Sequence, residues 1–168
     1  MFESPLFLAF PAAMTFAGAM DLLTMTIPNR ISIALAAAFV VAAAVAGLTV
    51  EQLAMHLAAF ALVLVIGIAM FAAGWLGGGD AKLMAVAGLW IGFDNLLDYF
   101  TQVALLGGVL AILILAYRRT PATSLPVAVP PWAERLHKQG GGMPYGIAIA
   151  GAALWIYPKT PWFSALSG

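Results

Sequence analysis

The order of apolar and polar positions divides the chain into six apolar stretches. They cover about residues 5–22, 31–50, 53–76, 81–93, 99–117 and 144–158. A helix needs about 20 apolar residues to cross a bilayer core. The fourth and sixth stretches are shorter, so they either join flanking segments or cross where protein surrounds the backbone. The pattern predicts an all-α, polytopic membrane helix bundle of about six transmembrane helices, with a short fourth helix after a glycine-rich break.

Composition supports this assignment and removes several classes of function. Of the 168 residues, 64% are hydrophobic and 8% are charged, against roughly 45–50% and about 25% in soluble domains. The net charge is zero, so we expect no nucleic-acid partner. The chain has no Cys and only two distant histidines, so we expect no metal and no cofactor. We expect one integral membrane domain over residues 1–168.

The positions of the basic residues predict the topology. Cytoplasmic loops are enriched in Lys and Arg. With the N-terminus outside, six bases fall on the inner side and only Lys159 falls outside. The six are Arg30, Lys82, Arg118, Arg119, Arg135 and Lys138. This count favours six spans over five. It also predicts a cytoplasmic loop at about 118–143. The prolines of this loop favour a solvated connector, and the alternative is a short helix on the membrane surface at 132–138.

Two acidic residues stand out, because an ionisable side chain costs ~2.5–3.5 kcal/mol at the centre of a membrane helix. Asp21 ends the first stretch, and Asp80 follows a glycine run that contains Gly77 and Gly79. The topology places both at similar depth on one side. Facing carboxylates can share a proton and activate water. Helix dipoles favour Asp80 as the base and Asp21 as the acid; the alternative is an inter-helix turn capped by Asp80.

Other polar positions have simpler interpretations. Pro28 and Asn29 form a turn after the first helix. Lys82 is a topology anchor or holds a nearby negative charge. Pro144 fits the first turn of the last helix, where Tyr145 either faces a substrate or lies in the aromatic belt.

His56, Asp94 and Asp98 lie on the outer side in this topology. His56, one turn inside the third helix, is expected to be a packed polar residue. Asp94 and Asp98 are one helical turn apart but are expected to lie in a solvated loop.

Three motifs in this order resemble the type IV prepilin peptidases, which are membrane aspartic peptidases of the GxGD class. The motifs are Asp21 with Ile27-Pro28-Asn29, the run Gly77-Gly78-Gly79-Asp80-Ala81-Lys82-Leu83, and Met143-Pro144-Tyr145-Gly146. The resemblance implies cleavage of a prepilin leader after a Gly, on the cytoplasmic side of the bacterial inner membrane. It also implies a lipid bilayer environment and contact with pilus secretion or assembly machinery.

The resemblance also assigns roles to residues. Asp21 and Asp80 would be catalytic. Motif support would come from Pro28, Asn29, Gly77, Gly79 and Lys82, and candidate substrate contacts from Pro144, Tyr145 and Gly146. Because the four-Cys region of many larger relatives is absent, N-methyltransferase activity is not expected, and the chain looks like the short, peptidase-only members of tight-adherence (Flp) pili. The alternatives are a proton-coupled transporter and an inactive pilus-assembly component.

Overall fold

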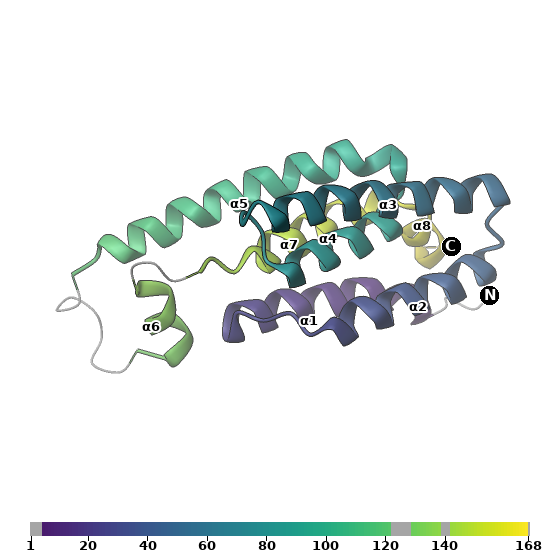
Figure 1. Ribbon diagram of the computed structural model, residues 1–168. Helices are drawn as coiled ribbons and strands as arrows, with labels where there is room; N and C mark the ends of the chain where they lie inside the picture. The colour runs from purple at the N-terminus through teal and green to yellow at the C-terminus, as the bar shows by residue number, and fades with distance from the viewer. Residues whose placement is uncertain (1–4, 122–128, 139–141, 168) are drawn as a thin grey trace.

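The computed structural model describes residues 5–121, 129–138 and 142–167, and these residues contain helices but no strand. Figure 1 shows an elongated bundle. The helices are η1 (Pro5–Leu8), α1 (Ala9–Thr24), α2 (Asn29–Ala46), α3 (Val50–Ala72), α4 (Gly78–Ile91), η2 (Phe93–Asn95), α5 (Leu96–Arg119), α6 (Pro131–His137), α7 (Tyr145–Ile156), η4 (Tyr157–Lys159) and α8 (Pro161–Ser167). The predicted fold class, an all-α membrane helix bundle, is confirmed.

Four helices have the length and hydropathy to cross a membrane. The spans are Leu6–Thr24, Asn29–Ala46, Val50–Ala72 and Phe93–Arg119. They correspond to the first, second, third and fifth apolar stretches. The other two stretches form α4, with 14 residues, and α7, with 12. At 1.5 Å per residue α4 reaches only about 21 Å, less than a hydrocarbon core of about 30 Å.

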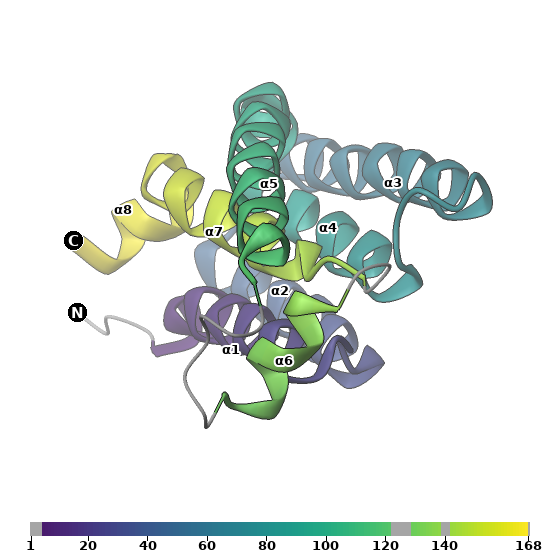
Figure 2. The same ribbon diagram turned by 90° about the vertical axis from the view of Figure 1, so that its left-hand side faces the viewer.

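Protein surrounds these two short helices. In α4, every residue from Leu83 to Ile91 is buried, and the helix contacts α2, α3 and α7. Helix α7 lies against α1 and α5, and its residues Ala148, Ile149 and Ala150 are buried. Figures 1 and 2 show both short helices inside the set of longer ones. Their lengths therefore agree with a crossing in which protein shields the backbone from lipid.

An aromatic core fixes α1 against α4 and the C-terminal helices. Phe10 of α1 stacks on Trp90 of α4 at 5.3 Å between ring centroids. The Tyr157 hydroxyl donates to the Phe7 carbonyl at 2.6 Å, and Trp162 Nε1 donates to the Trp90 carbonyl, also at 2.6 Å. Buried aromatic pairs add roughly 0.5–1.5 kcal/mol beyond their burial. This core sets the register of α1 beside α4 and α7, on which the position of the first aspartate depends.

The expected solvated connector is wrong for one part of the loop between α5 and α7. Residues 131–137 form α6, which begins with a proline at its first position, where the missing N–H costs nothing. Leu136 is buried, and Arg118 Nε donates to its carbonyl at 2.9 Å. Residues 122–128 and 139–141 of the predicted loop lie outside the described residues.

Candidate active site

The two singled-out aspartates line one cavity of about 270 Å³. The cavity lies between the connection from α1 to α2 and the connection from α3 to α4. Its lining residues are Asp21, Met25, Thr26, Ile27, Gly77, Gly78, Gly79 and Asp80. The first motif and the glycine-rich motif, which are far apart in sequence, therefore meet at the same place.

The end of α1 shapes one wall of this cavity. The backbone N–H of Met25 donates to the Asp21 carbonyl at 2.8 Å and closes the helix. Met25 has φ 55°, a left-handed conformation that costs a residue with a side chain roughly 1–2 kcal/mol. The chain thus turns sharply just after the Asp21 turn, and Ile27 comes back to face the cavity.

Asp21 is 5% exposed and is held by the N-terminus of α7. The backbone N–H of Gly146 donates to its Oδ2 at 2.7 Å. A helix N-terminus carries a partial positive charge, which stabilises the ionised form of a carboxylate. The contact orients Asp21 and favours it as a hydrogen-bond acceptor.

Glycine at position 146 makes this contact possible. A Cβ there would lie 2.8 Å from Asp21 Oδ2 and 2.9 Å from Ile27 Cδ1. Both distances are shorter than real Cβ contacts, so any side chain would push α7 or the carboxylate away. The motif resemblance predicts Gly146 as a candidate substrate contact, but not the hydrogen bond from its backbone N–H to Asp21. The helix-starting Pro144-Tyr145-Gly146 segment was the available signal.

Asp80 lies in the first turn of α4, outside the four candidate spans. Its Oδ1 is buried and has no hydrogen-bond partner among the described residues. Burial and then the charge of Asp21 raise the pKa of Asp80 to about 7, while a hydrogen bond from the Gly77 backbone opposes the shift. Two nearby carboxylates do not both ionise readily, so this shift favours a proton on Asp80 at neutral pH and below.

The glycine run lets α4 approach the first motif closely. A Cβ on Gly79 would lie 3.2 Å from Ile27 Cβ and 3.4 Å from the Ile27 carbonyl oxygen. A Cβ on Gly77 would lie 2.8 Å from Asp80 Oδ2. Because Gly77 and Gly79 have no side chains, neither position places a side chain between the cavity and Asp80.

Pro28, Asn29 and Lys82 do not line the cavity, but Asn29 and Lys82 connect the two motifs. Pro28 precedes the first residue of α2, Asn29. Lys82 Nζ donates to Asn29 Oδ1 at 3.0 Å. This bond ties the start of α2, which follows the Asp21 turn, to the start of α4, which carries Asp80.

The third motif divides between two places. Pro144 is buried and directly precedes α7. Tyr145 lines a separate cavity of about 360 Å³, together with residues of α3, α4 and α5 such as Met84 and Gly107. Gly146 of this motif contacts Asp21.

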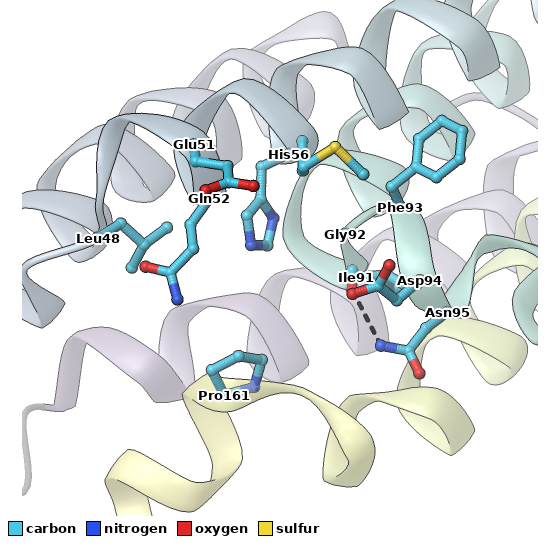
Figure 3. Close-up of a pocket in the computed structure, with 11 residues that line it drawn as sticks. Leu48, Glu51, Gln52, His56, Ile91, Gly92, Phe93, Asp94, Asn95 and Pro161 are labelled. Atoms are coloured by element: carbon cyan, nitrogen blue, oxygen red, sulfur yellow. Dashed lines mark hydrogen bonds between the residues drawn. The ribbon is translucent and has the colours of Figure 1, made fainter.

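A third cavity, of about 400 Å³, lies at the opposite end of α3 and α4 (Figure 3). Glu51 and Asp94 line it, but both are exposed. His56 is buried, and its Nδ1 lies 2.7 Å from the Leu89 carbonyl oxygen. His56 is therefore a packed polar residue, as predicted. Asp98 outside this cavity pairs with Lys159 at 2.6 Å, with both side chains exposed.

The donor groups also bear on metal binding. Within residues 5–121, 129–138 and 142–167, no group of three or more His, Cys, Asp and Glu residues is placed to hold a metal ion. Two carboxylates and a backbone N–H form an arrangement suited to proton transfer with water.

One comparison with known proteins gives a match. The family model described as the type IV leader peptidase family matches residues 8–113, which is more than half of the chain. The matched range contains both aspartates and the glycine run and ends before Gly146. No curated protein and no solved structure matches the chain.

Proposed function

Because the chain belongs to the type IV leader peptidase family, we propose that it cleaves the leader of a prepilin-like precursor with Asp21 and Asp80 as its catalytic pair. Membership makes it a membrane protease with a pilin precursor as substrate. The observation that carries the catalytic pair is the shared cavity: one carboxylate is held by a backbone N–H, and the other has a buried oxygen without a partner.

In the first step, water adds to the scissile carbonyl. Asp21, ionised and oriented by the Gly146 N–H, removes a proton from water as the water oxygen bonds to the carbonyl carbon. Asp80 donates its proton to the carbonyl oxygen, so that no free oxyanion forms. Each positioned acid or base typically contributes 10²–10⁴-fold to rate.

In the second step, the tetrahedral diol collapses. The proton on Asp21 moves to the amide nitrogen, the carbon–nitrogen bond breaks, and Asp80 recovers a proton from a hydroxyl of the diol. The products are a carboxyl group on the leader and a free amine on the mature pilin. Asp21 is again ionised and Asp80 again protonated, so the pair is ready for another cycle.

These roles reverse the assignment drawn from helix dipoles. The dipole at the start of α4 would favour an ionised Asp80, but it is worth only about 0.3–1 kcal/mol, less than the roughly 1.4 kcal/mol of one pKa unit. Burial and the neighbouring charge act in the opposite direction on Asp80 and outweigh it. Asp21 accepts a hydrogen bond from the N-terminus of another helix, α7, and the order of residues in the sequence does not reveal this contact.

The cytoplasmic position of the site is supported by the basic residues. Lys82 bonds to Asn29 beside the cavity. Arg135 of α6 donates to the carbonyl of Leu23, two residues after Asp21, and Arg118 donates to the Gly142 carbonyl. The basic loop thus packs at the aspartate end of the bundle, which the positive-inside rule places in the cytoplasm.

The substrate proposed is a small pilin precursor of the tight-adherence (Flp) type, cut after a Gly that precedes its apolar segment. The chain has no Cys, in keeping with a peptidase that does not methylate its product. The substrate's apolar helix approaches through the bilayer and presents the polar leader at the aspartate cavity.

The test is co-expression of the chain with a candidate prepilin, followed by mass spectrometry of the product. We expect a leader-shortened pilin that begins directly after a Gly, and no such product with Asp21→Asn or Asp80→Asn. Chelator should leave product formation unchanged. Retained cleavage in either variant removes that residue from the mechanism, and Asp-dependent uptake without cleavage would identify a transporter instead.

A further inference from the structure

An apolar groove runs along one side of the bundle between α2 and α3, with α4 as its floor. It consists of two cavities of about 370 and 550 Å³, which share Ala36 and Phe60 as lining residues. Helices α2 and α3 each pack on α4, and in Figure 2 they lie apart on either side of it. We call this feature the α2–α3 groove.

The length of the α2–α3 groove fits a membrane-spanning helix. Its lining extends from Asn29 and Lys82 at one end to Leu48 at the other. This is the whole length of α2, whose 18 residues correspond to about 27 Å, close to the thickness of a hydrocarbon core. The 360 Å³ cavity beside Tyr145 is apolar too, but its lining shares no residue with either of these two cavities.

The lining of the groove suits a helix better than a lipid chain. Small residues from two helices, Ala36, Ala43 and Ala85, line it, and small residues let a further helix backbone approach closely within a membrane. Polar side chains line only one end, where Ser32 lies near Asn29 and Lys82. An occupant must therefore be apolar along most of its length and polar at that end.

The polar end of the groove adjoins the aspartate cavity. Ile27 lines the aspartate cavity, and Asn29 lines the groove two residues later. Asp80 and Lys82 have the same relation on α4. A helix in the groove would therefore end beside the catalytic pair, and the chain continuing from it would enter the aspartate cavity.

We propose that the α2–α3 groove binds the apolar helix of the protein substrate, so that its polar leader reaches Asp21 and Asp80. This inference rests on the proposed function and adds the substrate-binding surface to it. The walls of the groove supply apolar contact area for the substrate helix, and the two aspartates cleave the peptide bond.

Photocrosslinking tests the inference with the full chain. Benzoylphenylalanine is placed at Val40, which lines the groove and is 67% exposed, or at the control position Ile112 on α5, which is 68% exposed. Both are combined with Asp80→Asn to retain the uncut prepilin. We expect at least about tenfold more peptidase–prepilin adduct from Val40, equivalent to a preference of about 1.4 kcal/mol, with the adduct mapping to the apolar segment of the prepilin.

The groove is not the substrate site if Val40 and Ile112 give equal yields of the prepilin adduct. The same conclusion follows if Val40 forms adducts with lipid or with a second copy of the chain but none with prepilin. Cleavage by the unsubstituted chain is measured in parallel. If it cuts prepilin while Val40 gives no adduct, the groove alone is wrong; if it does not cut, the proposed function is wrong.

A kinetic measurement supports the crosslinking. Ala36→Phe narrows the groove, and Ala104→Phe places the same side chain in the cavity beside Tyr145. We expect Ala36→Phe to raise KM by about tenfold, or about 1.4 kcal/mol in binding, with kcat retained, and Ala104→Phe to change neither. A fall in kcat with unchanged KM would contradict a role in binding.

Discussion

Acidic side chains lie near both ends of α3 and α4, but in different surroundings. At one end, Asp21 is buried and Asp80 has a buried oxygen without a partner, and both line a cavity of about 270 Å³. At the other end, Glu51 and Asp94 line a cavity of about 400 Å³ but remain exposed (Figure 3). The larger cavity holds the solvated acids, and the smaller one holds the desolvated pair.

Desolvation and mutual approach distinguish the two ends. A solvated carboxylate stays ionised and interacts weakly, whereas a buried pair shares a proton and so supplies an acid and a base together. At the far end, His56 uses Nδ1 to bond the Leu89 carbonyl and packs at 5.3 Å from the Phe39 ring. The number of ionisable groups is thus a poor guide to the active site.

The largest expected difference between the two ends comes from neutralising one acid at each. Asp21→Asn removes the base and should lower kcat/KM for prepilin cleavage by about a thousandfold or more. Asp94→Asn removes an exposed charge and should leave kcat/KM within about twofold, since the group takes no part in the reaction. Both are measured with purified enzyme in lipid; a comparable loss in Asp94→Asn would remove the distinction.

A smaller effect is expected from moving Asp21 without removing it. In Gly146→Ala the new Cβ would lie 2.8 Å from Asp21 Oδ2, and a displacement of about 1 Å at an active site can cost about 100-fold in rate. We expect kcat to fall about 10- to 100-fold with little change in KM. Gly108→Ala is the control, because nothing lies within 4 Å of its Cβ, and unchanged activity in Gly146→Ala would exclude the backbone contact from catalysis.

The pH profile should show which aspartate holds the proton. Because the mechanism needs protonated Asp80, whose pKa is raised to about 7, activity is lost as the pH rises above that value. Below it, activity is present as long as Asp21 stays ionised. We expect kcat/KM to fall by about tenfold per pH unit well above the midpoint. Glu51→Gln, at the opposite end of α3, should not change the pH at which kcat/KM begins to fall. A flat profile from pH 6 to 9 would show that Asp80 does not act as the acid.

The smallest effect is expected for the positioning residue Lys82. Lys82→Met breaks its bond to Asn29, and one exposed hydrogen bond is worth about 0.5–1.5 kcal/mol. We expect a loss of about threefold in kcat/KM, partial rescue by Lys82→Arg, and an unchanged pH midpoint. Lys138→Met removes an exposed ion pair with Glu134 and serves as the control. An equal loss of kcat/KM in Lys138→Met would show that Lys82 has no specific positioning role.

Much of the fold could be predicted because a bilayer limits what an apolar sequence can do. The six apolar stretches all correspond to helices, and the shortness of α4 and α7 was readable before their burial was known. The packing of α6 could not be predicted, because the proline-rich sequence around it has no periodic pattern of apolar residues. Its buried Leu136 is fixed by Arg118, a contact that depends on tertiary structure.

The site was predictable in part for a similar reason. Charge placement put Asp21 and Asp80 at one depth, and the structure places them at one cavity. The Gly146 N–H was not predictable, because a backbone donor leaves no mark in side-chain chemistry and comes from the far end of the chain. In the proposed mechanism this donor favours an ionised Asp21 as the base, whereas the local helix dipoles favour Asp80.

The catalytic pair is tested most directly by a double-substitution cycle on prepilin cleavage. Asp21→Asn, Asp80→Asn and the double variant are compared with the unsubstituted chain in kcat/KM, with folding checked by thermal unfolding of each. Residues that act as one unit lose activity non-additively, so the double variant should be no slower than the slower single variant. Losses that multiply, or substantial activity in either single variant, would show that the two carboxylates do not act as a pair.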